Sequence, residues 1–251
     1  MIKISAVSYL NTFPFIYGLE NAGYLHDFVV EKDVPAICAE KLLSGKVDIG
    51  LVPVAAIPLL KNAEIITDYC IGAVEKVKTV LLLSNQPLNN ISKIYLDFES
   101  RTSVQLVKVL AQNYWNISPC WEKLDTDFNH KLNANEAVVL IGDKTFTATE
   151  HYPYVYDLAT EWYSFTGLPF VFACWVANKK LPENFIADLN KTLKYGVNHI
   201  NETVAVFKKD IPANVDAIDY FTNNISYQLD DAKRKGMELF FKYLKKVEGG
   251  Y

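Results

Sequence analysis

Small polar side chains gather at three points of the chain where an apolar run meets a helical pattern. In chain order these are Ser8, Tyr9, Asn11 and Thr12; Ser100, Arg101, Thr102 and Ser103; and Thr166 with Gly167. In an open α/β sheet, ligands bind at the carboxyl ends of strands, where helix N-termini direct free N–H groups and a positive dipole outward. Hydroxyl and amide groups at these points suit a ligand that carries carboxylates. The alternative is that Ser100, Thr102 and Asp143 are simply helix N-caps.

Other kinds of catalytic site leave no signature in this sequence. The HExxH, paired Cys/His and EF-hand patterns of metal sites are absent, as are the GxGxxG and P-loop patterns of nucleotide sites and the GxSxG pattern of hydrolases. We therefore expect no metal and no cofactor. His26, His130, His151 and His199 lie in polar or helical contexts that indicate surface positions, and His151 is the best candidate among them for a base.

The elements that must position these groups begin with alternating strands and helices. Short apolar runs in the first half predict strands at residues 2–7, 28–34, 47–52, 65–71 and 79–83. After the second run, Pro35 suits the first turn of a helix, and Gly45 suits the left-handed position just past its end. This alternation indicates an α/β protein with a mostly parallel sheet and helices on both faces.

The alternation restarts in the middle of the chain and gives way to helices toward its end. Further strands are predicted at residues 94–97, 135–142 and 169–176. Ser100 opens one helix, Asp143 is expected to cap a second, and Pro182 begins a third. The last segment, 229–247, is predicted to be a helix with an apolar face inward and its lysines, Lys233 among them, outward.

Two α/β sets without a flexible linker predict two lobes joined by extended strands. The long apolar runs at 79–84 and 170–178 are the expected crossings. One lobe would then contain residues 1–83 and 176–251, from both ends of the chain, and the other residues 84–175, from its middle. A cleft between two lobes is a common place for a ligand.

The composition is that of an ordinary globular protein. The 251 residues are 50% hydrophobic and 22% charged, which argues against disorder, and the net charge of −4 argues against a nucleic-acid partner. Basic residues in the last helix are explained by its C-terminal dipole. No apolar run approaches the length of a membrane span, and the N-terminus shows no signal peptide. Cys38, Cys70, Cys120 and Cys174 are dispersed without a CxxC pair, as expected of free thiols in the cytoplasm.

Four blocks of sequence carry a resemblance to a known family. They are SYLNT at 8–12, LDFESRTSVQLVKVL at 96–110, VVLIGDKTF at 138–146 and TGLPFVFACW at 166–175. In this order they resemble the chorismate dehydratases of menaquinone biosynthesis by the futalosine route. The resemblance covers nearly the whole chain. It implies the two-lobed type II periplasmic-binding-protein fold, a cytoplasmic enzyme without a cofactor, and chorismate as the small-molecule substrate.

The resemblance also implies roles for the polar groups. Asn11 and Ser8 are expected to act in catalysis, while the enolpyruvyl carboxylate of the substrate takes the proton from C3, because the motifs contain no evident base. The residues expected to contact the substrate are Tyr9, Thr79, Ser100, Arg101, Thr102, Ser103, Asp143, Thr166 and Gly167. Thr79 stands where a serine is expected in the family pattern, which keeps the hydroxyl and adds a methyl group. For Arg101 and Asp143 a structural role is an open alternative.

Two other functions are compatible with these residues. The 1,4-dihydroxy-6-naphthoate synthase of the same pathway shares the expected fold and acts on a larger substrate. A cytoplasmic sensor would instead bind an aromatic acid without turnover. The SRTS and TGLPFVFA blocks favour the dehydratase over the synthase.

Overall fold

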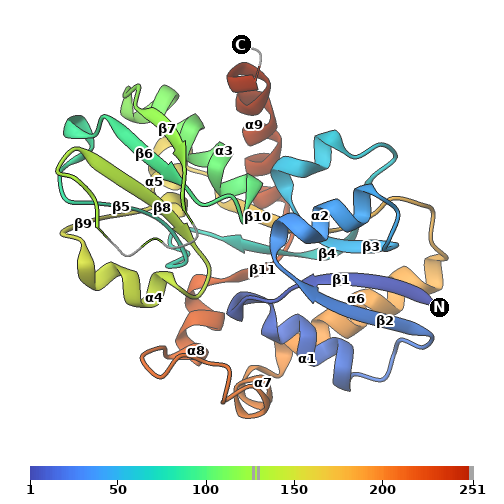
Figure 1. The fold of residues 1–251 in the computed structure, drawn as a ribbon. Helices are drawn as coiled ribbons and strands as arrows, with labels where there is room; N and C mark the ends of the chain where they lie inside the picture. The colour runs from blue at the N-terminus through green and yellow to red at the C-terminus, as the bar shows by residue number, and fades with distance from the viewer. Residues whose placement is uncertain (126–127, 129–130, 249–251) are drawn as a thin grey trace.

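The strands of the protein form two sheets side by side, seen in a computed structural model that describes residues 1–125, 128 and 131–248 (Figure 1). In the described residues, the first sheet has the order β11-β4-β10-β3-β1-β2 and the second the order β7-β6-β8-β5-β9. The strands of the first are β1 (Ile2–Val7), β2 (Phe28–Asp33), β3 (Ile49–Pro53), β4 (Glu64–Ala73), β10 (Phe170–Ala177) and β11 (Ser226–Gln228). Those of the second are β5 (Val80–Ser84), β6 (Lys93–Leu96), β7 (Cys120–Lys123), β8 (Glu136–Ile141) and β9 (Tyr154–Asp157). The first sheet therefore draws on both ends of the chain and the second on its middle.

The chain passes between the sheets at two short connections, residues 74–79 and 167–169. Neither apolar run that was expected to cross does so. β5 pairs along its length with β8 and β9, and β10 pairs along its length with β4. The expected lobe boundaries after residues 83 and 175 thus fall inside strands. A buried strand within one sheet and a strand running between sheets have the same apolar pattern, so the pattern alone does not distinguish them.

Strand directions are mixed in both sheets. β1 pairs in parallel with β2 and β3, and β6 pairs in parallel with β7 and β8. β10 runs antiparallel between β3 and β4. The reason is that the chain enters β10 from the second sheet, beside the end of β4 at which it left the first sheet. The strands that the sequence did not predict, β7, β9 and β11, all lie at sheet edges. Edge strands are half exposed and lack the continuous apolar run of a central strand.

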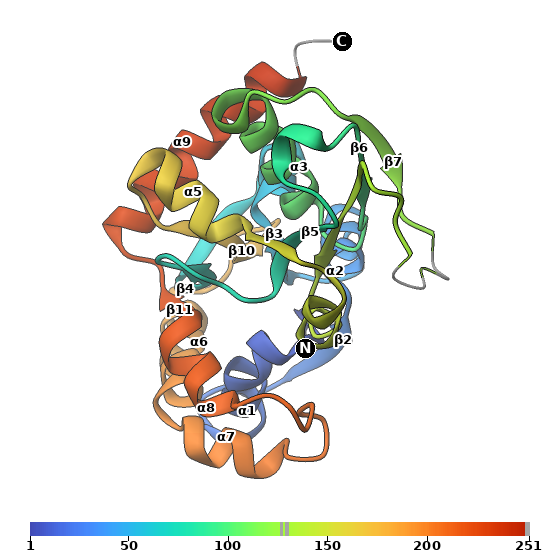
Figure 2. The same cartoon turned by 90° about the vertical axis from the view of Figure 1, so that its left-hand side faces the viewer.

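Helices flank both sheets (Figures 1 and 2). They are α1 (Phe13–Asn21), α2 (Pro35–Leu43), α3 (Arg101–Leu110), α4 (Thr145–Ala148), α5 (Leu158–Thr166), α6 (Glu183–Asn198), α7 (Ile200–Val206), α8 (Ala217–Asp219) and α9 (Asp231–Glu248). Pro35 stands in the first turn of α2, Ser100 caps α3, and Pro182 precedes α6, as predicted. α1 and α6 pack so closely that a Cβ atom at Gly196 would overlap the carbonyl oxygen of Pro14.

The last helix differs from its prediction in two ways. Lys233 is 2% exposed and forms an ion pair with Asp230 at 2.6 Å, whereas an outward position was expected. The stem of Lys233 lies against Gly72 of β4, which leaves room for it. In addition, α9 contacts α3 and places Phe240 against Trp162 of α5, so it joins the first sheet to the helices of the second. Among the described residues, no helix is long and apolar enough to span a bilayer.

Candidate active site

A small cavity lies where the loops of the two sheets meet. Its polar lining consists of Tyr9, Asn11, Thr79, Ser100 and Ser103. Its apolar lining includes Ile71, Ile141 and Phe172. Among the described residues, no Asp, Glu, His, Lys or Arg side chain lines it.

The loop after β1 brings Asn11 to the cavity. β1 ends at Val7, and the chain turns through a 3₁₀ turn, Leu10–Thr12, into α1. The backbone of this turn is held by the Tyr227 hydroxyl, which donates to the carbonyl oxygen of Asn11 at 3.0 Å. Ser8, which was predicted to act with Asn11, is exposed and is not part of the cavity lining.

Tyr9 reaches from the first sheet to the second. Its hydroxyl donates to a carboxylate oxygen of Glu99 at 2.6 Å. Its ring lies against Gly142, where a Cβ atom would be 3.0 Å from the ring and where φ is +71°. Burial, together with the neighbouring Glu99, raises the pKa of Tyr9 above its usual range. Tyr9 is therefore a neutral hydrogen-bonding group at the wall of the cavity.

Asp143 also joins the two sheets, and it does not cap α4. Both of its carboxylate oxygens accept the backbone N–H of Leu10, at 3.1 and 3.2 Å. The N-cap position of α4 is Lys144, and no side chain caps that end. Gly142 makes a left-handed turn, and Asp143 follows it, one residue before the N-cap position of α4. The strand–Gly–Asp pattern, which predicts a helix cap, therefore places this carboxylate in contact with the other side of the cleft. Burial raises the pKa of Asp143 above its usual range.

The N-terminus of α3 supplies the hydroxyl groups of the second wall. Ser100 accepts the backbone N–H of Ser103 at 3.4 Å, and the Ser103 hydroxyl lies 3.3 Å from that of Ser100. Both side chains are nearly buried and both line the cavity. Ser100 is thus an N-cap and a cavity residue at once. The positive end of α3 at this point favours an anionic group.

The other predicted contact residues lie elsewhere. Thr102 is fully buried, donates to the carbonyl oxygen of Phe172 at 3.1 Å and accepts the N–H of Ala55 at 3.2 Å. Arg101 lies in a separate groove beside α2. Thr166 donates to the carbonyl oxygen of Trp162, and Gly167 ends α5 with φ of +69°. Successive residues of a helix point about 100° apart, so the SRTS segment cannot present all of its side chains to one cavity.

Two tyrosines of the C-terminal segment contact residues of this site, and sequence reasoning missed them. Tyr220 and Tyr227 are 1% and 5% exposed. The hydroxyl of Tyr220 lies 2.8 Å from that of Thr79, and the hydroxyl of Tyr227 binds the backbone of Asn11. Both stand more than a hundred residues from their partners, and no spacing in the sequence links them. Aromatic residues in a helical segment ordinarily indicate core positions.

The described histidines lie away from the cavity. His26 and His151 are exposed, and the ring of His199 stacks on Tyr195 at 3.9 Å. His130 lies outside the described residues. His151, the best candidate base by sequence, is not a lining residue. In the part of the chain that the structure describes, no group of His, Cys, Asp and Glu side chains could hold a metal ion.

Comparison with known proteins gives the family. A family model described as menaquinone biosynthesis matches residues 2–246. The chain belongs to this menaquinone-biosynthesis family. A relative named chorismate dehydratase, from Thermus thermophilus, is 26% identical over 262 aligned residues, covering 92% of this chain and 95% of its own length.

Solved structures confirm the fold of this menaquinone-biosynthesis family member. A protein from Archaeoglobus fulgidus superposes with a TM-score of 0.71 at 13% identity, covering 99% of this chain and 97% of its own. A Candida albicans protein described as having the generic periplasmic binding protein fold gives 0.63 at 14% identity, covering 99% of this chain and 94% of its own. The predicted two-lobed α/β fold of the periplasmic-binding-protein type is therefore correct.

Proposed function

We propose that this protein is a chorismate dehydratase, which converts chorismate to 3-[(1-carboxyvinyl)oxy]benzoate and water in menaquinone biosynthesis. The observation that carries the proposal is a cavity between two lobes, lined by uncharged hydroxyl and amide groups beside a helix N-terminus. Family membership and the Thermus thermophilus relative named chorismate dehydratase support it.

Chorismate carries two carboxylates, and the polar groups that line the cavity come from two parts of the structure. One carboxylate lies at the N-terminus of α3, where the Ser100 and Ser103 hydroxyls and the helix dipole favour an anion. Asn11 and Thr79 donate to the other end of the ligand from the first lobe and from the connection between the lobes. Neutral donors bind carboxylates through hydrogen bonds to the charged group, which are stronger than hydrogen bonds between neutral groups.

The reaction breaks the C3–H and C4–O bonds of chorismate. The C3 proton is allylic and conjugated through the ring alkene to the C1 carboxylate, so its removal leaves a delocalised dienolate. The electron pair then forms the third ring double bond as hydroxide leaves C4, and the hydroxide takes up a proton to become water. Aromatisation supplies the driving force, so the protein chiefly orients the substrate and stabilises the spreading charge.

The substrate itself supplies the base. Among the described residues, no carboxylate, imidazole or amine lines the cavity, and the raised pKa of Tyr9 keeps its phenol protonated. The nearby carboxylates of Glu99 and Asp143 accept hydrogen bonds from Tyr9 and from the N–H of Leu10. The enolpyruvyl carboxylate, attached through oxygen to C3, can fold back onto the C3 proton and remove it.

The test is incubation of the purified protein with chorismate, without added metal or nucleotide, and detection of a product lighter by one water. We expect the carboxyvinyloxy-benzoate, with turnover strongly reduced by Asn11→Ala and unchanged by Asn90→Ala, an exposed asparagine in the connection between β5 and β6. Wild-type turnover in Asn11→Ala would refute this assignment of the site. Saturable thermal stabilisation by chorismate without turnover would instead favour a sensor. If chorismate gave neither turnover nor stabilisation, the substrate of the naphthoate synthase would be assayed next.

A further inference from the structure

We infer that Tyr220 is a positioning residue of this site, whose hydroxyl donates its proton to Thr79 and thereby directs the Thr79 hydroxyl proton toward the ligand in the cavity. The inference rests on the proposed function and assigns a role to a residue that does not itself line the cavity. It is carried by a short buried contact between the two hydroxyl groups.

The contact has little competition from other groups. The Tyr220 and Thr79 oxygens are 2.8 Å apart, and the two residues are 1% and 2% exposed. The other partner of the Thr79 hydroxyl is the carbonyl oxygen of Val77 at 3.4 Å, which is at the outer limit of a hydrogen bond. Thr79 also lines the cavity.

The number of protons determines what each hydroxyl can do. Each hydroxyl has one proton to donate and lone pairs to accept. If Thr79 donated to Tyr220, it would face the ligand only as an acceptor and would repel a carboxylate. If Tyr220 donates to Thr79, the Thr79 proton is free for the ligand.

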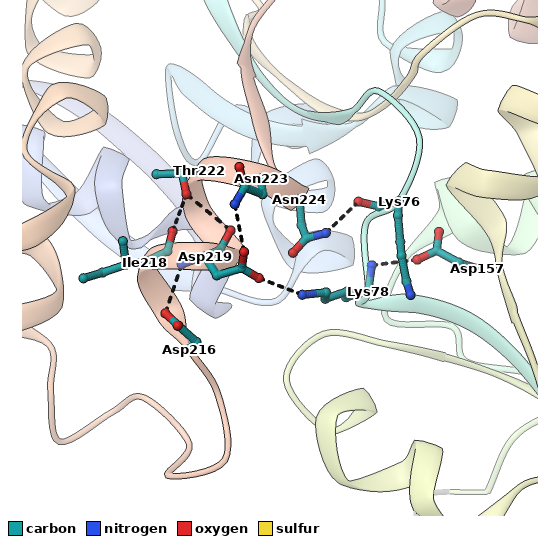
Figure 3. A network of polar contacts seen from close by, with 9 residues as sticks. All are labelled: Lys76, Lys78, Asp157, Asp216, Ile218, Asp219, Thr222, Asn223 and Asn224. Carbon is teal, nitrogen blue, oxygen red and sulfur yellow. Dashed lines mark hydrogen bonds and ion pairs between the residues drawn. The ribbon is translucent and has the colours of Figure 1, made fainter.

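The connection that carries Thr79 is held on both sides (Figure 3). On the first-sheet side, the Lys78 ammonium pairs with Asp219 at 2.9 Å and the carbonyl oxygen of Lys76 accepts from Asn224 at 3.3 Å. On the second-sheet side, the Lys78 N–H donates to Asp157 at 2.7 Å. Lys76 and Lys78 closely precede Thr79, so these contacts limit the freedom of the backbone that bears it.

The segment that carries Tyr220 is ordered in the same network (Figure 3). Asp216 caps α8 by accepting the N–H of Asp219 at 3.0 Å, and Thr222 donates to the carbonyl oxygen of Ile218 at 2.7 Å. The ring of Tyr220 packs edge-on against Phe146 at 5.3 Å between centroids. The ring is therefore placed by packing, and a phenylalanine at position 220 retains every contact except those of the hydroxyl.

The experiment is a double-mutant cycle on chorismate turnover with Tyr220→Phe, Thr79→Val and the double variant. We expect kcat to fall about tenfold in Tyr220→Phe and about tenfold to a hundredfold in Thr79→Val, because each change removes or misdirects one donor to developing charge. In the Thr79→Val background, Tyr220→Phe should change kcat by less than about twofold. In a Thr79→Ser background, which keeps the hydroxyl, the tenfold effect of Tyr220→Phe should persist.

Tyr152→Phe is the matched control, because Tyr152 is also a buried tyrosine but belongs to the separate apolar cluster of the second lobe. Its kcat should equal that of the wild type. The inference would be overturned if Tyr220→Phe kept the wild-type kcat. It would also be overturned if the effects of Tyr220→Phe and Thr79→Val on kcat multiplied in the double variant. Either result would leave the proposed function intact. Absence of turnover in the wild type would overturn the proposed function, and the inference with it.

Discussion

The cavity side chains of Tyr9, Asn11 and Thr79 are all uncharged at neutral pH. In the proposed function this neutral site binds a dianion, so it must rely on directed hydrogen bonds and on the N-terminus of α3. Directed donors are specific in geometry, because each hydroxyl or amide has few protons and must point them correctly. The proposed chemistry therefore depends on the orientation of these groups more than on their ionisation.

The first prediction concerns the pH dependence of turnover. Because burial raises the pKa of Tyr9 and no other lining side chain of the described residues ionises near neutrality, kcat should be flat between about pH 6 and 9. The substrate carboxylate that takes the proton is already ionised throughout this range. A pH–rate profile of the wild-type protein measures this, and a bell-shaped curve inside that range would indicate an enzymic acid or base instead.

The second prediction compares two variants at Asn11. Asn11→Ala removes a hydrogen-bond donor from the cavity. Asn11→Asp also removes the donor, and it introduces a negatively charged side chain of almost the same size as asparagine. We expect Asn11→Asp to weaken chorismate binding at least about tenfold more than Asn11→Ala, since like charges at close range repel strongly in a partly buried site. Calorimetric titration measures both affinities. Equal affinities would mean that Asn11 does not face a carboxylate.

At the scale of elements, strand ends and helix starts decide which side chains reach the cavity. α3 presents Ser100 and Ser103 to it and directs Arg101 and Thr102 elsewhere, because the helical turn separates neighbours. The turn after β8 places Gly142 under the ring of Tyr9 and Asp143 beside Leu10. Short connecting turns thus select the site residues from longer polar segments.

The third prediction tests the turn at Gly142. Gly142→Ala should lower the free energy of unfolding by about 1–2 kcal/mol, because alanine is strained at positive φ. It should also reduce kcat/KM by about tenfold or more, because the added Cβ displaces Tyr9. Gly45→Ala is the control: Gly45 has φ of +70° and open space around it, so it shares the backbone strain without the clash. Equal kcat/KM in the two variants would show that the position of Tyr9 is unimportant.

At the scale of the molecule, the two lobes are joined by contacts across the cleft as well as by the chain. Tyr9 binds Glu99, the Leu10 N–H binds Asp143, and Thr102 binds Ala55 and the carbonyl of Phe172. A continuous cluster of buried apolar side chains also includes members of both sheets. The lobes therefore share one interior around the cavity, and changes at the cleft are expected to affect global stability.

The fourth prediction concerns Asp143 and pH. Burial raises the pKa of Asp143 in the folded protein, so its contribution to stability is fully present below its unfolded pKa of about 3.9 and is lost as the pH rises through the folded value. The amide introduced by Asp143→Asn does not titrate and keeps an oxygen for the Leu10 N–H. The free energy of unfolding of this variant, relative to wild type, should thus increase between about pH 4.5 and 7. Denaturant unfolding at both pH values measures it, and a decrease would contradict the raised pKa.

The sequence alone determined the class of fold and much of the polar chemistry. Apolar runs predicted the central strands, and Pro35, Ser100 and Pro182 marked helix starts, because propensity, capping and periodicity are local properties. The motifs also singled out Asn11 and Thr79, and both line the cavity. Edge strands were missed, since they lack a fully buried run.

The tertiary structure decided which polar groups share one cavity. It placed Ser8, Arg101, Thr102 and Thr166 away from the lining, and it brought the remote Tyr220 to Thr79. It also turned Asp143 from an expected cap into a contact between lobes. These outcomes depend on side-chain direction and on the packing of segments far apart in the chain, and neither is encoded in local spacing.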